Sequence, residues 1–340
     1  MPSDRATSAV APPALPTIHL AAQHSPGDVR ALVAAGVWQR VRRGAYVDAA
    51  YLEPPTEGAS RPGARHLGAR RRALAHVAAV IAGNRGRGAD VVLSHESAAL
   101  LWGLPLWRSP ERVHLLVRER RSVRAAPDVA GHRVSLGPEH LSSRAGVTIT
   151  SLERTVLDLA CQRSTVEGLV VADAALARGV ERARLDEMAH ARAAARGVTR
   201  AREVIALADG LAESPWESCT RLHAIAAGMP RPRLQVPIAT RLGTYRADMG
   251  WDEWRGLIEF DGQVKYGELA DGDPARVVFE EKRRQDAIEE AGWRFRRVTS
   301  RDFRDHRALH ERMRSLTPAA ERRHMVPRPH LLLPGRSSRS

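Results

Sequence analysis

Acidic residues in the C-terminal third of the chain have the types and spacing that suit a hard metal ion. Asp248 lies at the end of an apolar segment, residues 244–249, and the returning segment, residues 254–261, ends in Glu259 and Asp261. Residues two apart in a strand share a face, so Glu259 and Asp261 are expected to project together. Carboxylates at the ends of two adjacent strands can hold Mg²⁺, with waters and a substrate phosphate completing its shell. Because such an ion activates bound water and stabilises charge on phosphoryl oxygens, the pattern predicts phosphodiester hydrolysis.

Two further residues join this candidate site. Ser214 and Pro215 predict the start of a helix with Glu217 in its first turn, where it suits a capping box, a third metal ligand, or both. Lys265 follows Asp261 by four positions and is expected to orient the attacking water or neutralise the scissile phosphate. The candidate catalytic residues are therefore Glu217, Asp248, Glu259, Asp261 and Lys265. The expected cofactor is Mg²⁺ or Mn²⁺, held by Glu217, Asp248 and Glu259.

The elements that must position these residues follow from apolar periodicity. Helices are predicted over residues 215–228, 276–291 and 300–314, and strands over 235–238, 244–249, 254–261 and 293–298. This order predicts an αβββαβ core over residues 211–317, which we expect to fold alone. The apolar run at Leu257 and Ile258 leads directly into Glu259, and a buried carboxylate is costly without a cationic partner.

The N-terminal region predicts a second functional element. A short helix over residues 28–35 ends at Gly36, and residues 37–47 predict two strands with a turn at Gly44. A helix followed by a basic hairpin is the layout of a winged helix-turn-helix, which we place over residues 16–50. Its arginines would contact duplex phosphates, although an ordinary hairpin with a solvated basic face fits the same pattern. The predicted nucleic-acid contacts are Arg40, Arg42 and Arg43 here, with Arg221 and Arg284 in the C-terminal region.

Between these regions, residues 52–64 form a Pro/Gly-rich linker. Residues 65–210 predict a small α/β unit with a helical tail. Its strands are expected at 91–93, 113–117 and 147–150, with Ser94 capping one helix and a Thr150–Glu153 capping box starting another. Three more helices are predicted at 165–178, 182–195 and 198–209. The ends of the chain, residues 1–15 and 318–340, have the composition of disordered tails, the second one basic. The overall prediction is an α/β multidomain protein.

Charge narrows the choice of partner. The chain has 340 residues, enough for two or three domains, with 53 Lys and Arg against 39 Asp and Glu and a formal net charge of +14. This excess favours a nucleic acid, most naturally double-stranded DNA, although a merely basic protein or a genome rich in G and C would also give it. No apolar run reaches about 18 residues, so no membrane span is expected.

Cysteine and histidine patterns argue against other classes of site. Cys161 and Cys219 lie in segments predicted to be helical and lack CxxC spacing, which suits a reducing cytoplasm rather than a disulfide framework or a zinc site. The N-terminus lacks the apolar core of a signal peptide. The histidines His95, His114, His132 and His223 show neither HExxH nor HxH spacing, so we expect them to be capping or packing residues rather than zinc ligands.

Residues 213–303 resemble the domain of unknown function related to very-short-patch-repair endonucleases, in the PD-(D/E)XK superfamily. The match rests on residues 214–217, Arg221, Gln235, 246–248, 259–262, 265–266, 281–286 and 292–293. The resemblance implies a restriction-endonuclease-like fold with Glu217, Asp248 and Glu259 as metal ligands. The sequence departs from the superfamily motif because Asp261, not lysine, stands two positions after Glu259. Lys265 would have to supply that lysine from another position.

The N-terminal part resembles the winged-helix domain of type IV (abortive-infection) antitoxins. The match includes residues 36–38 and 40–47, and residues 94–99, 103–105 and 151–159 resemble the middle region of actinobacterial proteins of this kind. This resemblance implies transcriptional control and a cognate toxin as partner. Two hypotheses therefore remain open: a metal-dependent endonuclease that binds DNA, and a non-catalytic regulator with a degenerate nuclease domain.

Overall fold

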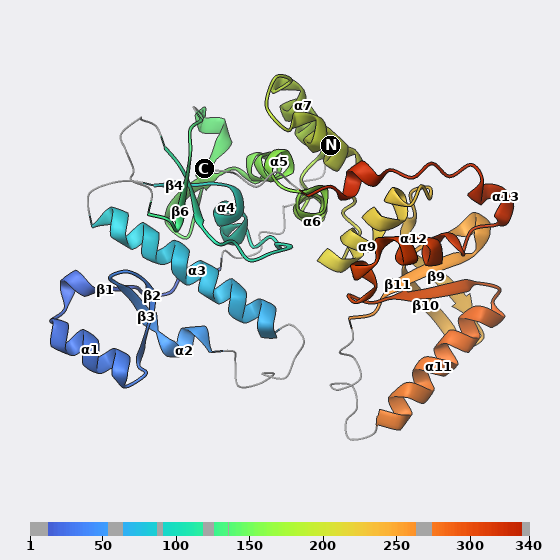
Figure 1. Ribbon diagram of the computed structural model, residues 1–340, viewed down its shortest axis with the longest axis horizontal. Helices are drawn as coiled ribbons and strands as arrows, with labels where there is room; N and C mark the ends of the chain where they lie inside the picture. Colours follow the sequence, from blue (N-terminus) through green and yellow to red (C-terminus); the bar gives the residue numbers. More distant parts are fainter. Residues whose placement is uncertain are drawn as a thin grey trace, which may run out of the picture. The chain divides into compact units, whose positions relative to one another are not determined.

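The protein is described here by a computed structural model that covers residues 13–53, 64–86, 91–117, 126–134, 136–262 and 274–334. Within these ranges it is an α/β protein with three separate sheets. The chain forms two compact units, and it passes between them more than once (Figure 1). The N-terminal unit contains residues 1–161 and 178–195, and the C-terminal unit contains residues 162–177 and 196–340. No helix in the described ranges is both long and apolar enough to cross a membrane.

A small antiparallel sheet begins the N-terminal unit. Its strands are β1 (His19–Leu20), β2 (Trp38–Arg42) and β3 (Ala45–Asp48), in the order β1-β3-β2. Helix α1 (Pro26–Ala34) precedes β2 and is capped by Ser25, whose Oγ accepts from the Asp28 amide at 3.1 Å. Gly44 has φ +73°, which a tight turn between strands requires. The predicted helix and basic hairpin are confirmed; the turn η1 (Ala21–Gln23) stands where a winged helix would need a further helix.

The second sheet of the N-terminal unit has five strands in the order β6-β5-β4-β8-β7. They are β4 (Val92–Leu93), β5 (Val113–Leu116), β6 (Val129–His132), β7 (Leu141–Arg144) and β8 (Val147–Thr150). Helix α2 (Ala49–Leu52) leads toward α3 (Ala64–Arg85). The latter and α4 (His95–Leu101) bury apolar side chains such as Leu74, Val77 and Leu101 against this sheet. Helix α5 (Leu152–Gln162) follows β8.

Two predicted helix caps differ from the observed ones. The Oγ of Ser151, rather than that of Thr150, accepts from the backbone of Arg154, at 3.2 Å, because Thr150 bonds Thr155 within the core. The Ser94 side chain makes no cap hydrogen bond and instead contacts His95. After α5 the chain forms the expected helices α6 (Thr165–Leu176), α7 (Arg182–Ala191) and α8 (Val198–Leu207).

The C-terminal unit contains a four-stranded sheet in the order β12-β11-β10-β9. The elements are α9 (Pro215–Ala226), β9 (Arg233–Thr240), β10 (Gly243–Trp251), η3 (Asp252–Trp254), β11 (Gly256–Phe260), α11 (Pro274–Glu290), β12 (Arg294–Val298), η4 (Asp302–Arg304) and α12 (His306–Arg314). β9, β10 and β11 are antiparallel, and β12 runs parallel to β11. One apolar cluster joins the sheet to α9 and α12, and another joins it to α11. Figure 1 shows these helices beside the sheet. The element order is the predicted one.

The side chains of β10 change face at Asp248. Tyr245 and Ala247 pack in the cluster under α11, whereas Met249 and Trp251 pack in the cluster under α9 and α12. On the neighbouring strand, Gln235 has φ +53°, a conformation uncommon for a residue with a Cβ atom. This irregularity lies at the point where the candidate carboxylates gather, and local distortion of a strand is a common way to re-aim a side chain.

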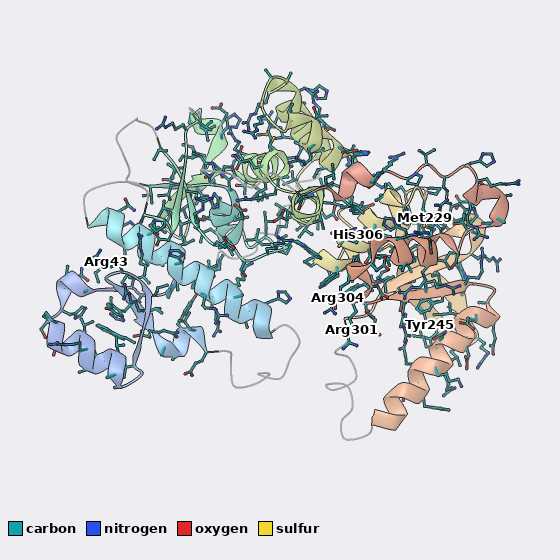
Figure 2. The ribbon with its side chains drawn as sticks, in the orientation of Figure 1. Arg43, Met229, Tyr245, Arg301, Arg304 and His306 are labelled. Carbon is teal, nitrogen blue, oxygen red and sulfur yellow. The ribbon has the colours of Figure 1, made fainter. Side chains whose placement is uncertain are left out.

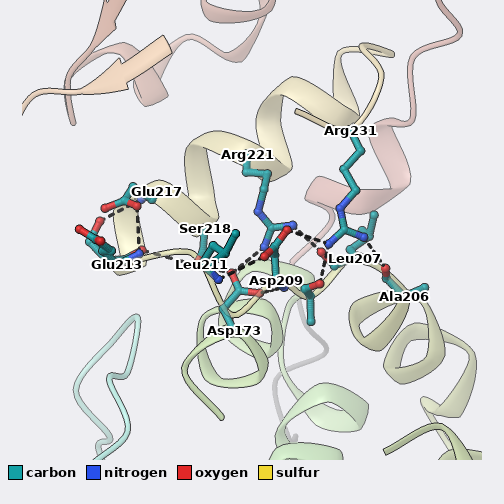
Figure 3. Close-up of polar contacts among 12 residues, drawn as sticks. Asp173, Ala206, Leu207, Asp209, Leu211, Glu213, Glu217, Ser218, Arg221 and Arg231 are labelled. Atoms are coloured by element: carbon teal, nitrogen blue, oxygen red, sulfur yellow. Dashed lines mark hydrogen bonds and ion pairs between the residues drawn. The ribbon is translucent and has the colours of Figure 1, made fainter. Parts of the chain in front are cut away.

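Helices α6 and α8 belong with the C-terminal unit, although the sequence analysis placed their residues in the central region. The contact is polar and buried: Arg221 of α9 donates to Asp173 of α6 at 2.6 Å and to the carbonyl of Leu207, and Ser218 donates to the same carboxylate at 2.6 Å (Figure 3). The Arg221 side chain is 0% exposed. This corrects its predicted role, because a guanidinium enclosed in this way holds helices together and does not reach a nucleic acid.

The segment after α12 is also ordered where the structure describes it, through residue 334, which corrects the prediction of a disordered tail from residue 318. It contains α13 (Ala319–Arg322) and η5 (Pro329–Leu332). Leu331 is buried, and the Arg328 amide donates to the carbonyl of Ala226 at the end of α9 at 2.8 Å. The composition suggested disorder, but one buried leucine and a backbone hydrogen bond dock this segment on α9.

Candidate active site

Glu217 serves both as a helix-start residue and as a member of the site. The Oγ of Ser214 accepts from the Glu217 amide at 3.1 Å, as the capping pattern predicts. The Glu217 carboxylate also has a side-chain hydrogen bond with Ser214, which lowers its pKa. It accepts from the amide of Glu213 at 2.9 Å and from Nε2 of Gln235 at 3.0 Å, as Figure 3 shows in part. Because Gln235 belongs to β9, these contacts tie the start of α9 to the sheet.

Asp248 and Glu259 are neighbours on adjacent strands. The antiparallel register pairs Met249 with Ile258, so the next pair along is Asp248 with Glu259. The Asp248 carboxylate accepts from the amide of Phe260 at 2.8 Å, which fixes it against β11. Phe260 itself stacks on Trp216 of α9, with ring centroids 4.7 Å apart. The strands β10 and β11 and the first turn of α9 thus bring Trp216 and Phe260 into contact, although they are 44 positions apart in the sequence.

Burial changes the acidity of this group. It raises the pKa of Glu217 to about 7, a value to which the nearby charge of Asp248 contributes and which the hydrogen bond from the Glu213 amide opposes. Burial likewise raises the pKa of Glu259 to about 7; Arg284 opposes this rise and Asp248 adds to it. The charge of Asp248 therefore raises the pKa of both glutamates, so the three carboxylates lie close enough to interact electrostatically. Such a group cannot be fully ionised near neutral pH unless a cation compensates it.

Part of that compensation comes from helix α11. Arg284 forms ion pairs with Glu259 and, at 3.5 Å, with Glu281. Its guanidinium is thereby held at the candidate site, and its predicted contact with nucleic acid stays a prediction. The ligand atoms of the three carboxylates are not all within 4.8 Å of one another. Among the described residues, His95, His114 and His132 do have ligand atoms this close. A metal shared by the three carboxylates would require their oxygens to move closer together.

The two remaining predicted catalytic residues lie beyond the end of β11. Asp261 is partly exposed, and its amide donates to the carbonyl of Val298 at 2.8 Å, continuing the pairing of β11 with β12. Lys265 lies outside the residues that the structure describes, so its predicted role stays a prediction.

The predicted hairpin arginines differ in their surroundings. Arg40 and Arg43 are exposed, and Arg43 is labelled in Figure 2. Arg42 is instead ion-paired with Asp128 at 3.2 Å, and His76 of α3 contacts the same carboxylate at 2.8 Å. Arg42 thus links the hairpin to the rest of the N-terminal unit, and two of the three predicted cations remain available to a partner.

Sequence reasoning missed two features. Gln235 had no assigned role, although its side chain donates a hydrogen bond to Glu217. The sequence feature that could have indicated this role is an amide side chain on β9, the strand next to the one that carries Asp248. The grouping of His95, His114 and His132 was also missed. These residues lie on a helix start and on two strands, so their spacing in the sequence gives no sign that they meet.

Comparisons with known proteins give distant relatives only. The chain is 29% identical over 211 residues to two proteins of Mycobacterium tuberculosis, uncharacterized protein MT2308 of strain CDC 1551 / Oshkosh and uncharacterized protein Rv2248 of strain H37Rv. The matched region covers 61% of this chain and 73% of each relative. No protein-family model matches the chain. No solved structure matches it significantly.

Proposed function

We propose that the C-terminal unit is a metal-dependent nuclease of the PD-(D/E)XK type that hydrolyses phosphodiester bonds in DNA. One observation carries the proposal: burial and the nearby charge of Asp248 raise the pKa of both Glu217 and Glu259 to about 7. Three partly buried carboxylates close together are costly to ionise. Groups with pKa values raised in this way are candidates for functional sites. The element order α9, β9, β10, β11, α11, β12 supports the αβββαβ core of this class.

In this proposal each residue has a separate task. Asp248 and Glu259 bind Mg²⁺ or Mn²⁺ directly, and Glu217 binds it directly or through a water. The ion would activate a water molecule and stabilise charge on the phosphoryl oxygens. Gln235 holds the Glu217 carboxylate in place through its 3.0 Å hydrogen bond. Arg284 neutralises Glu259 until the ion arrives, and its guanidinium then suits a phosphate oxygen.

The decisive experiment compares two aspartates in a plasmid-cleavage assay with Mn²⁺ or Mg²⁺. In Asp248→Asn the side chain can still accept from the Phe260 amide, so the fold is expected to survive while cleavage falls by on the order of 10²-fold or more. The matched control is Asp252→Asn, because Asp252 is exposed in η3 and pairs only at 3.2 Å with the exposed Arg233. Equal cleavage by wild type and Asp248→Asn would show that the activity comes from elsewhere.

A regulator that binds DNA without cutting it is the second candidate. The ion pair between Arg284 and Glu259 favours it, because this pair occupies a predicted metal ligand, as a degenerate nuclease domain would. Calorimetric titration with Mn²⁺ separates the two: the nuclease requires binding that Asp248→Asn weakens. Wild-type protein that binds DNA but neither binds Mn²⁺ in this unit nor cleaves would reject the nuclease and leave the regulator, for which a toxin is a possible class of partner.

Either function uses DNA binding, and the hairpin supplies a test of it. Replacing Arg40 and Arg43 with alanine should reduce the slope of log K against log salt concentration by roughly 0.9 for each lost phosphate contact. Arg42→Ala is the control: it removes the pair with Asp128, so it should lower thermal stability and change the slope less. An unchanged slope in the double variant would remove the hairpin from the DNA-binding surface.

A further inference from the structure

Three histidines meet inside the N-terminal unit. His95 is the first residue of α4, His114 lies in β5 and His132 is the last residue of β6. One ring nitrogen from each lies within 4.8 Å of the others, and Nδ1 of His114 is 2.8 Å from Nε2 of His132. His95 and His114 are 1% and 4% exposed, so these imidazoles meet away from bulk water.

We propose that His95, His114 and His132 bind one transition-metal ion, with Zn²⁺ as the preferred species. Neutral imidazole is a preferred ligand of Zn²⁺, and three histidines with a fourth position left to water or a carboxylate form a known zinc arrangement. Hard ions such as Mg²⁺ favour oxygen ligands instead. The site is thus different in chemistry from the carboxylate group of the C-terminal unit.

The surrounding oxygens decide which ring nitrogens face the ion. Oε2 of Glu96 lies 3.4 Å from Nε2 of His114, and Oγ of Ser94 lies 3.0 Å from Nδ1 of His95. Metal-bound histidines usually donate their other ring N–H to a carboxylate or another oxygen, which fixes the tautomer. This pattern assigns Nε2 of His95, Nδ1 of His114 and Nε2 of His132 as the three ligands, with Ser94 and Glu96 as their outer partners.

The backbone around the histidines is already held in place. The Ser94 amide donates to the His114 carbonyl at 3.0 Å, and the His114 amide donates to Oγ of Ser97 at 2.9 Å. These two bonds fasten the start of α4 to β5 in both directions. His95 has φ +49°, a left-handed conformation that is disfavoured for a residue with a Cβ atom and that gathers at functional sites.

Small side-chain rotations suffice to admit the ion. A tetrahedral ion with bonds of about 2.05 Å holds its nitrogen ligands about 3.3 Å apart, so the 2.8 Å separation must open by about half an ångström. The rings of His95 and His132 are stacked with centroids 3.8 Å apart, and both must tilt for their nitrogens to converge. Rotation of a histidine ring about its last side-chain bond has a broad energy minimum, which allows this tilt.

The test uses the full-length protein stripped of metal by a chelator. Zn²⁺ affinity is measured against a chromophoric competitor, and Co²⁺ binding is followed by visible absorption, which reports tetrahedral nitrogen ligation. His132→Asn removes a direct ligand, so it should weaken Zn²⁺ binding by more than about 100-fold. Loss of an outer partner alone already costs about 10-fold to 100-fold. The matched control is His310→Asn, since His310 contacts His223 at 3.2 Å in the C-terminal unit, where a second group of histidines could bind the ion.

The proposal expects one Zn²⁺ per chain, a tetrahedral Co²⁺ spectrum in wild type and His310→Asn, and loss of that spectrum in His132→Asn. Glu96→Gln provides a second, milder variant with weakened binding should His132→Asn fail to fold, as judged by circular dichroism. The proposal is overturned by wild-type protein that fails to bind Zn²⁺ stoichiometrically, or by His132→Asn and Glu96→Gln that both bind like wild type. Loss of binding in His310→Asn alone would also overturn it. None of these readouts depends on DNA cleavage.

Discussion

Glu217 and Glu259 show what a candidate active site costs the protein that carries it. A rise of the carboxyl pKa from 4.5 to about 7 corresponds to about 3 kcal/mol for each ionised group, since one unit corresponds to about 1.4 kcal/mol. Two buried glutamates that remain costly to ionise, although Gln235 and Arg284 partly compensate them, are not explained by helix capping or by packing alone. The proposed function accounts for this cost, because metal binding requires negative charge in this place.

The raised pKa values predict how stability depends on pH. Each glutamate binds a proton more tightly in the folded state, so its contribution is fully present below pH 4.5 and is lost as pH rises from 4.5 through about 7. Glu217→Gln removes this penalty and keeps an acceptor for the Glu213 amide. We expect the variant to exceed wild type in free energy of unfolding at pH 8, by up to about 3 kcal/mol, and not at pH 4.5. Urea denaturation at the two pH values measures this.

The comparison at two pH values controls for other titrating groups. Burial, with His306 and His310 nearby, lowers the pKa of His223 to about 3, which opposes the glutamates because a buried neutral imidazole loses stability as pH falls below its ordinary value. His223 is present in both proteins, so its effect cancels in their difference. A Glu217→Gln protein less stable than wild type at pH 8 would contradict the assignment of a raised pKa.

At the residue scale the acids were predictable and their partners were not. Asp248 and Glu259 follow from strand patterns, because carboxylates that follow apolar runs are conspicuous in a sequence. The ion pair of Arg284 with Glu259 could not be predicted from the nearby sequence, because Arg284 lies on a separate helix, α11. The burial of Arg221 is equally hidden, because its partner Asp173 is 48 positions away on another helix.

Helix α9 ends at a glycine that is fitted against the C-terminal segment. Gly228 has φ +86°, and a Cβ atom there would lie 2.8 Å from the backbone of Val326. We expect Gly228→Ala to destabilise the protein by on the order of 2 kcal/mol or more, because it combines a disfavoured conformation with a clash against backbone atoms. Thermal denaturation of the full chain measures the loss.

Gly36 supplies the matched control for that substitution. It likewise follows the C-cap of a helix, α1, and has φ +71°, but a Cβ atom there meets nothing within 4 Å. Gly36→Ala therefore reports the conformational cost alone, and Gly228→Ala should exceed it. Equal losses would mean that residues 326–328 do not pack on α9 in solution.

Element order was largely predictable because apolar periodicity is local. The helices and strands of residues 215–314 occur where the sequence analysis places them. The C-terminal segment was not predictable, because Pro and Arg dominate its composition while its docking depends on Leu331 and one backbone bond to Ala226. The predicted helix caps at Ser94 and Thr150 were also wrong, because each hydroxyl contacts another side chain instead of a helix amide.

At the scale of the whole molecule, the predicted autonomy of residues 211–317 conflicts with the contacts of α9. A fragment of these residues keeps Arg221 but loses Asp173 and the Leu207 carbonyl, which leaves a fully buried guanidinium without its acceptors. Breaking a buried pair in this way costs about 3–5 kcal/mol. We expect residues 211–317 alone to be far less stable than residues 162–334, as chemical denaturation followed by circular dichroism would show.

A third fragment isolates the cause. In residues 211–317 with Arg221→Met, the apolar side chain needs no acceptor, so stability should be partly restored. If instead the unaltered fragment matches the longer one in its denaturation midpoint, the contacts with α6 and α8 contribute little, and the domain boundary predicted from the sequence stands.

The contact between α6 and α9 also sets an order of events during synthesis. Asp173 emerges from the ribosome 48 residues before Arg221, an interval of roughly 2–10 s at ordinary elongation rates. During that time the Asp173 carboxylate of α6 lacks Arg221 and Ser218, the two side chains of α9 that donate to it in the finished protein. The nascent chain must therefore carry a carboxylate without its final partners until α9 arrives, so this buried contact can form only late in synthesis.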